Sequence, residues 1–169
     1  MSHLLKKQTG VDQALVAHYF GSKQQLFSAV VEPPFDPAVV LDRLHAAGQP
    51  GVGHRLAEFV VSIWESPDNR LMVTGLIRAA ATEDQAAVLI RDLVTRRLLV
   101  PLAIRIGSDH PELRASLIAS RVVELTTARH IIGLNPLLSA PNKLLVSSLA
   151  SVFDYYLNGK LEELSRPNS

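Results

Sequence analysis

Apolar residues recur at helical spacing along this chain, in segments that proline and glycine separate. Between residues 54 and 66, for example, Leu56, Phe59, Val60 and Ile63 stand at positions i, i+3, i+4 and i+7. That repeat places side chains on one face of an α-helix. No segment of strand length alternates apolar and polar residues. The pattern therefore predicts an all-α fold with about eight or nine helices.

Turn-forming residues set the expected limits of these helices. Asp36 is expected to cap a helix that has Pro37 in its first turn, and the GQPGVG stretch at 48–53 is expected to end it. Pro101 is expected to kink the helix that contains it, and LNPLLSAPN, from 134 onward, is expected to be a loop. The other expected helices cover 54–66, 69–82, 84–106, 111–132 and 142–157.

Composition restricts the class of protein. Hydrophobic residues make up 47% of the 169 positions and charged residues 20%, which is typical of a soluble globular protein. Cysteine is absent, so disulfides and thiolate metal sites are excluded. The N-terminus lacks the apolar segment of a signal peptide, and no apolar run reaches membrane-spanning length. We therefore expect a cytoplasmic protein with no membrane partner.

Positive charge is concentrated near the N-terminus. Residues 1–31 contain Lys6, Lys7 and Lys23 against Asp12 alone, whereas the remainder is close to neutral and the whole chain carries +1. A basic end on a near-neutral body suits contact with a polyanion such as DNA. The asymmetry is small, so the pattern of residues inside this segment carries more weight.

The stretch GVDQALVAHYFGSKQQLF, which begins at Gly10, has the residues that two short helices and their turns require. Gly10 can adopt a left-handed conformation that ends a preceding helix, and Asp12 suits the N-cap of the next one. Ser22 and Gln25 form a capping-box pattern for a second helix. Small and polar residues on the outer face of the first helix permit entry into a DNA major groove.

This stretch resembles the helix-turn-helix of the TetR family of bacterial transcriptional regulators. The resemblance is carried by GVDQALV at 10–16, HYFGSK at 18–23 and LF at 26–27. It implies that the first helix of the pair is the recognition helix and that Tyr19 and Lys23 contact phosphates. The DNA-binding residues implied by the resemblance are Gln13, Ala14, Leu15, Ala17, His18, Tyr19 and Lys23.

The family pattern also has a helix ahead of this motif, and here only the short stub His3–Thr9 precedes it. We therefore expect either an N-terminally truncated regulator, whose binding to double-stranded DNA is doubtful, or a true start further upstream. Segments of the body, including RLAEFVVSIWESPDNR and RDLVTRRLLVPLA, resemble the ligand-binding and dimerisation domain of one branch of the family.

The resemblance implies two domains: a partial, remnant helix-turn-helix DNA-binding domain over 1–31, and a helical-bundle effector-binding and dimerisation domain over 36–160. The implied function is transcription regulation, as a repressor that binds palindromic operator DNA as a homodimer and is released by a small apolar effector. The alternative is a dimeric, small-molecule-binding helical module with impaired DNA binding.

Two sets of residues are candidates for the effector pocket and the dimer interface. For the apolar pocket candidates, ordinary core packing is favoured over the lining of an effector cavity. Arg78 is either a polar anchor or an exposed residue. Arg121, Glu124 and Arg129 either form interhelical pairs at the interface or face solvent. The pocket set is Phe59, Ile63, Trp64, Met72, Leu76 and Arg78. The interface set is Leu117, Arg121, Leu125, Val146, Leu149 and Phe153.

Signatures of catalysis are absent from the sequence. It contains no nucleophile elbow, phosphate-binding loop or paired carboxylates. His45, His54, His110 and His130 are scattered, without the spacing of a metal site. We therefore expect a protein that is not an enzyme and has neither a metal nor another cofactor.

Overall fold

The structure, a computed structural model of the chain, describes residues 35–45 and 51–161. Every regular element in these two ranges is helical and none is a strand, which confirms the prediction of an all-α fold. The expected helix-turn-helix over 1–31 lies outside the described residues. Among the described helices, none combines the length and the apolar character that crossing a bilayer requires.

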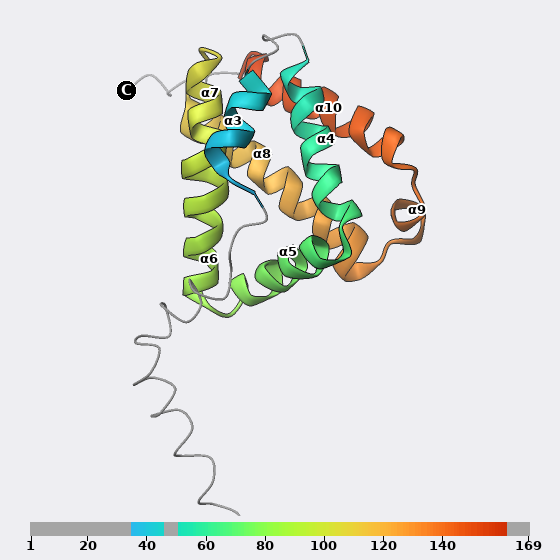
Figure 1. Ribbon diagram of the computed structural model, residues 1–169. Coiled ribbons are helices and arrows are strands. Elements are labelled where there is room, and N and C mark those ends of the chain that lie inside the picture. The colour runs from blue at the N-terminus through green and yellow to red at the C-terminus, as the bar shows by residue number, and fades with distance from the viewer. Residues whose placement is uncertain (1–34, 46–50, 162–169) are drawn as a thin grey trace, which may run out of the picture.

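Ten helical segments follow one another in the described ranges (Figure 1). Two of them, labelled η, are π-helical and have wider turns than an α-helix. The segments are α3 Pro37–His45, α4 Val52–Glu65, α5 Pro67–Ala80, α6 Asp84–Ile90, η1 Arg91–Leu99, α7 Val100–Arg105, α8 Pro111–Thr126, η2 Thr127–Ile132, α9 Asn135–Leu138 and α10 Asn142–Asn158.

The two longest predicted helices are present as continuous rods. The first consists of α6, η1 and α7, and the second of α8 followed by η2. Gly107 and Gly133, which follow the two rods, both have φ of 75°. Because that left-handed conformation is strained for other residues, glycine is suited to ending a helix in this way. Both ends were predicted correctly from the sequence.

The distortion expected at Pro101 takes a different form from a simple kink. Pro101 lies in the first turn of α7, and the π-helical turns of η1 come directly before it. Proline has no backbone N–H, and its ring crowds the preceding turn. The wider turns of η1 accommodate both effects within one rod.

At two prolines the sequence analysis missed a helix or began it too late. The stretch from 134, expected to be a loop, contains α9, and α5 begins at Pro67 instead of residue 69. Proline is tolerated in a first helical turn because its missing N–H would have no partner there. Ser66 caps α5 by accepting a hydrogen bond from the Asn69 amide at 3.4 Å. The expected cap of α3 is confirmed, since Asp36 Oδ1 accepts from the Ala38 amide at 2.9 Å.

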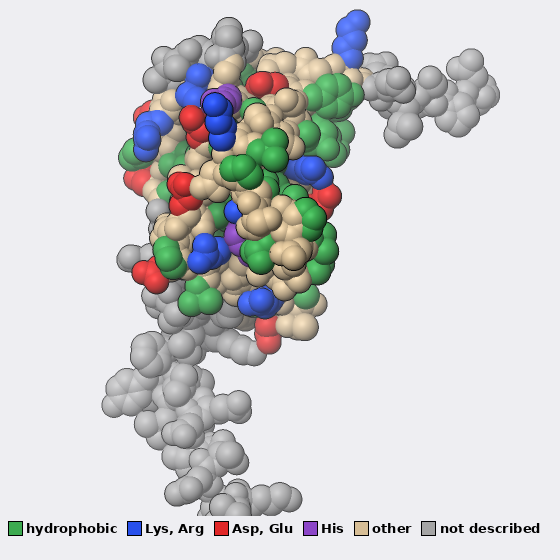
Figure 2. Space-filling view, turned by 90° about the vertical axis from the view of Figure 1, so that its right-hand side faces the viewer, with side chains coloured by type: hydrophobic (Ala, Val, Ile, Leu, Met, Phe, Trp, Pro, Cys, Tyr) green, Lys and Arg blue, Asp and Glu red, His purple; other side chains and the backbone are tan. Residues whose placement is uncertain are grey.

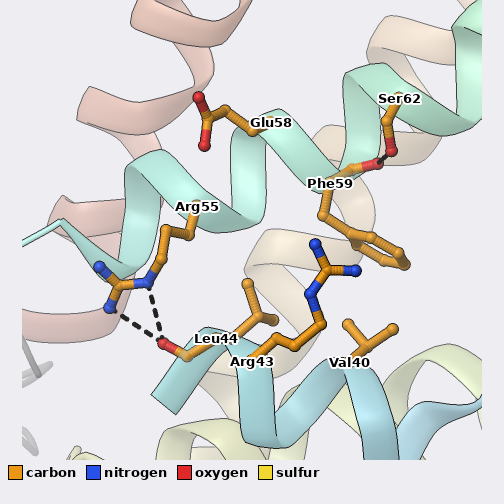
Figure 3. Close-up of a pocket in the computed structure, with 7 residues that line it drawn as sticks. All are labelled: Val40, Arg43, Leu44, Arg55, Glu58, Phe59 and Ser62. Carbon is orange, nitrogen blue, oxygen red and sulfur yellow. Dashed lines mark hydrogen bonds between the residues drawn. The ribbon is translucent and has the colours of Figure 1, made fainter. Parts of the chain in front are cut away.

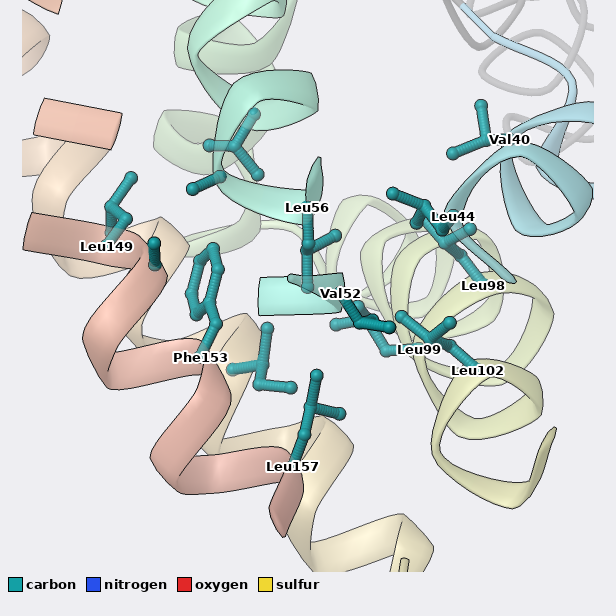
Figure 4. Packing of buried hydrophobic residues seen from close by; sticks show 14 of the residues in the cluster. Val40, Leu44, Val52, Leu56, Leu98, Leu99, Leu102, Leu149, Phe153 and Leu157 are labelled. Carbon is teal, nitrogen blue, oxygen red and sulfur yellow. The ribbon is translucent and has the colours of Figure 1, made fainter. Parts of the chain in front are cut away.

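The core lies between α4 and α10, which form the most extensive helix pair of the described residues (Figure 4). Phe153 of α10 is 0% exposed, and Leu56 of α4 is 1% exposed. Leucines of η1 and α7 close the same core from the opposite side of α4, as Figure 4 shows for Leu98, Leu99 and Leu102. Burying each such side chain contributes about 1.5–3 kcal/mol to folding.

The close approach of α4 and α10 depends on Gly53. Its amide donates a hydrogen bond to Asp154 Oδ1 at 2.9 Å, although the two residues are 101 positions apart. A Cβ atom at position 53 would lie 2.3 Å from that oxygen and 2.7 Å from the Asp154 backbone nitrogen. Asp154 also places a carboxylate at the N-terminus of α4, where free N–H groups favour negative charge.

We predict that Gly53→Ala lowers the free energy of unfolding by about 1–3 kcal/mol, because the new methyl group pushes α10 away from α4. Gly75→Ala in α5 is the matched control, since nothing lies within 4 Å of a Cβ at that position. The control should raise stability by up to about 1 kcal/mol through the better helix propensity of alanine. Urea denaturation measures both, and equal effects would contradict the proposed role of Gly53.

Arg114 ties the start of α8 to the end of α10. Its side chain is almost fully buried, at 2% exposure for the residue. Its guanidinium forms an ion pair with Asp109 and donates from Nη2 to the Gly159 carbonyl at 2.7 Å. A third contact is to the carbonyl of Tyr156. Each buried donor therefore has a partner, which is what makes burial of this charge tolerable.

Candidate functional site

One face of α5 carries a row of polar side chains that lines an open cleft. Arg70, Thr74 and Arg78 are spaced four residues apart, so they lie on one side of the helix. The opposite wall comes from η2 and α9, and the cleft has a volume of about 590 Å³. The lining residues are Pro67, Arg70, Leu71, Thr74, Arg78, Arg129, His130 and Leu138.

The α5 wall is held in place by hydrogen bonds near the start of the helix. Arg70 Nη1 donates to the Trp64 carbonyl at 3.0 Å, which places the guanidinium at the C-terminal end of α4. A cation is favourable there because carbonyl groups lack partners at that end of a helix. Thr74 is buried and donates from Oγ1 to the Arg70 carbonyl at 2.9 Å. Both side chains are therefore held by contacts within the chain.

The η2 wall is positioned by Trp64. The Trp64 indole Nε1 donates to Thr126 Oγ1 at 3.2 Å, at the last residue of α8. The Trp64 ring also meets the His130 ring edge-on, with centroids 5.6 Å apart. Because Trp64 is 4% exposed, it belongs to the core and supports the cleft from behind. A π-helical segment at this point is in keeping with the frequent use of π-turns at functional sites.

The cleft is electrostatically positive. Its lining includes Arg70, Arg78 and Arg129 but no acidic side chain, and no ion pair is formed by these arginines among the described residues. Arg129 Nε and Nη1 and His130 Nε2 are shielded from solvent without a hydrogen-bond partner. In Figure 2, Lys and Arg side chains and a histidine are visible both in the upper left and in the lower half of the face shown, with hydrophobic groups among them.

The pKa values of the η2 side chains respond to this environment. Burial, together with the smaller effects of the positive charges of Arg129 and Arg70, lowers the pKa of His130 to about 4. Burial and the charge of Arg70 also lower the pKa of Arg129. Arginine remains protonated at neutral pH, whereas His130 is neutral. At neutral pH the cleft therefore combines permanently charged arginines with the neutral imidazole of His130.

We predict that His130 makes the protein less stable in acid. Because the folded pKa of about 4 is below the ordinary 6.5, the unfolded chain binds a proton at higher pH than the folded one. Its stabilising contribution is full above pH 6.5 and is lost as pH falls toward 4. His130→Gln should flatten the free energy of unfolding across this window, measured by urea denaturation. The exposed His45→Gln control should keep the slope of the unmodified protein, and an unchanged slope in His130→Gln would contradict the prediction.

A second, smaller cavity lies between α3 and α4 (Figure 3). Its volume is about 290 Å³, and its walls include Arg43, Glu58 and Phe59. Arg55 donates from Nε and Nη2 to the Leu44 carbonyl, at 3.1 and 2.9 Å, and so joins the two helices. Because acidic and basic groups are both present and Arg55 is engaged with the backbone, this cavity has no comparable excess of charge.

The structure does not bring the predicted pocket residues together. Arg78 is exposed and lines the large cleft, and Phe59 lines the small cavity, where its ring meets Phe35 edge-on at 5.1 Å. Trp64 is in the core. The remaining predicted residues, Ile63, Met72 and Leu76, are half-buried and line neither of these two cavities.

Of the cleft residues, only Arg78 is in the sequence-based pocket set. The polar residues that it missed are Arg70, Thr74, Arg129 and His130. The four-residue spacing of Arg70, Thr74 and Arg78 is a signal that a scan for polar stripes on helices could have found. No sequence signal places Arg129 and His130 opposite that stripe, since η2 is about 50 residues away and reaches α5 only through the tertiary fold.

The predicted dimer interface needs correction at three positions. Leu125, Leu149 and Phe153 are 9%, 1% and 0% exposed, so the core of the single chain already covers them. Leu117, Arg121 and Val146 are half-buried. Arg121 pairs with Glu124 on its own helix at 2.8 Å, so this pair is intrahelical. Arg129 lines the cleft described above.

Within the described ranges, no group of three or more His, Asp or Glu side chains is arranged so that it could hold a metal ion. The DNA-contact residues expected between Gln13 and Lys23 lie outside the residues that the structure describes. The described residues thus form a helical bundle with one strongly cationic cleft between α5 and η2.

Comparison with known families agrees with this architecture. A family model described as "Tetracyclin repressor-like, C-terminal domain" matches residues 51–157, which is most of the chain. The chain therefore belongs to the tetracycline repressor-like family. No curated protein and no solved structure matched the chain in the corresponding searches.

Proposed function

We propose that this protein is a TetR-type transcriptional regulator that represses its targets as a homodimer and releases DNA when a small molecule binds. The family match over residues 51–157 carries the proposal. The helix-turn-helix motif from Gly10 to Phe27 supports it, because a DNA-reading unit then precedes a helical body. In this organisation residues 1–31 contact DNA in the cytoplasm, and residues 36–160 bind the effector and form the dimer.

The outer faces of α8 and α10 are suited to dimer formation. Leu113 on α8 is 54% exposed, and Leu144 and Tyr155 on α10 are 58% and 55% exposed. Between the last two, the exposed face of α10 carries Ser147, Ser148 and Ser151, whose small side chains permit close approach of another helix. Two copies of α8 and α10 related by a twofold axis would then pack as a four-helix interface.

We predict that Leu144→Arg weakens dimerisation at least about tenfold, since it places a charge in an apolar contact. Val39→Arg on α3 is the matched control, because Val39 is 55% exposed and α3 packs mainly against α4, η1 and α7 rather than against α8 or α10. Analytical ultracentrifugation over a concentration series measures both dissociation constants. A Leu144→Arg protein that dimerises like the control would place the interface elsewhere.

The mechanism follows from this geometry. A twofold dimer that holds two recognition helices about 34–36 Å apart reads two half-sites one helical turn apart. An effector that binds more tightly to a body with a different separation shifts the population away from the DNA-binding state. Its differential affinity for the two states then sets how strongly DNA is released.

We predict that the full chain enriches a palindromic sequence from fragmented genomic DNA of its source organism. In gel shifts, Gln13→Ala should weaken binding to that sequence by about 1–3 kcal/mol, as expected for loss of a base contact. Lys23→Gln should weaken binding to all sequences and reduce its salt dependence. Lys143→Gln, at an exposed position on α10, is the control. A stable dimer with no sequence-specific binding would instead favour a small-molecule-binding module.

A further inference from the structure

We infer that the cleft between α5 and η2 binds a small organic anion, a carboxylate that carries an apolar portion, through Arg70, Arg78 and Arg129. This inference rests on the proposed function, in which the body binds an effector, and it names the chemical class of that effector. It also changes the expectation from sequence, which was an apolar effector without a stated charge.

The first support is the unbalanced charge of the cleft. Three arginines line one cleft with no acidic side chain among the lining residues. Arg129 and Arg70 are close enough for their charges to act on each other and on His130. Like charges at short range in a partly buried site are unfavourable. An anionic ligand removes this repulsion and supplies the missing counter-charge.

The second support is the set of donors without partners. Within the part of the chain that the structure describes, Arg129 Nε and Nη1 are shielded from solvent and have no hydrogen-bond acceptor. His130 Nε2 is shielded as well and has no hydrogen-bond partner of either kind there. The one hydrogen bond of the Arg129 guanidinium is a long one, from Nη2 to the Ala140 carbonyl at 3.5 Å. Buried polar groups in folded proteins are normally satisfied, so a guanidinium with two unpaired nitrogens indicates a missing partner. A carboxylate is a suitable one because it accepts two parallel hydrogen bonds from an arginine.

The third support is the division of the cleft into fixed and free groups. Arg70 is anchored to the Trp64 carbonyl, whereas Arg78 is exposed and has no hydrogen bond among the described residues. Anchored Arg70 presents a preorganised charge on the α5 wall of the cleft, and Arg78 is free to close over a ligand. A carboxylate bound by an arginine of α5 and by Arg129 at the same time would hold α5 against η2.

Two exposed leucines that line the cleft indicate that its ligand has an apolar portion. Leu71 of α5 and Leu138 of α9 line the cleft and are 69% and 50% exposed. Exposed leucines beside a cationic cleft offer apolar surface to the part of a ligand that is not charged. The volume of about 590 Å³ lies within the range of small-molecule sites, roughly 300–1,000 Å³.

The test is isothermal titration of the full chain with two carboxylates, octanoate and benzoate, and with their neutral analogues, octanamide and benzamide. Inorganic phosphate serves as a control anion that has no apolar portion. At least one carboxylate should bind about tenfold or more tightly than its amide and than phosphate, because charged hydrogen bonds to arginine are lost in the amide. Equal binding of carboxylate and amide, no binding of either carboxylate, or phosphate binding as tightly as the carboxylates would overturn the inference.

Variants assign the binding to this cleft. Arg129→Gln and Arg78→Gln should each weaken carboxylate binding at least about tenfold, and Arg78 is exposed enough that its replacement leaves folding intact. Arg91→Gln, at an exposed arginine of η1 outside the cleft, should bind like the unmodified protein. Unchanged binding in Arg78→Gln and Arg129→Gln would show that the anion binds elsewhere and would refute the assignment.

The DNA experiment separates this inference from the proposed function. Carboxylate binding that depends on Arg129, without sequence-specific DNA binding, would support the anion site and contradict the regulator. Sequence-specific DNA binding without carboxylate binding would support the regulator and contradict the anion site. Release of the enriched DNA by octanoate or benzoate, abolished by Arg78→Gln, would support both.

Discussion

The close approach of α4 and α10 at Gly53 is the contact on which the rest of this structure depends. The hydrogen bond from the Gly53 amide to Asp154 joins the two helices where a larger residue would not fit. Along this pair the chain buries Leu56 and Phe153, around which η1, α7 and α8 are packed. The C-terminal end of the same α4 carries Trp64, so the helix that builds the core also positions the cleft.

The cleft illustrates how a stable core supports a site that is electrostatically unfavourable by itself. Trp64 is buried, hydrogen-bonded to Thr126 and in contact with the His130 ring. That rigid support keeps η2 near α5 although Arg129 and Arg70 repel each other. The chain supplies no counter-charge of its own in this cleft, and we infer that an anionic ligand supplies it. Arg114 shows the contrast, because its buried charge is fully paired within the chain.

Much of the fold could be predicted from sequence because helix limits are local. Glycines with positive φ end both long rods at Gly107 and Gly133, and caps such as Asp36 act within two residues. Less of the site could be predicted. The spacing of apolar residues indicates that the Phe153 side chain is buried. It does not indicate whether residues of the same chain or of a second copy bury it. The same ambiguity made Trp64 a pocket candidate when it is a core residue.

The sequence by itself determined the all-α class, the order of the helices and the family resemblance, because these follow from periodicity, caps and short motifs. The tertiary structure alone decided which polar residues meet. Arg70 and Arg78 belong to one helix, and Arg129 and His130 follow some 50 residues later. Their proximity depends on how α5 packs against η2, an arrangement set by long-range packing around Trp64 that no local pattern encodes.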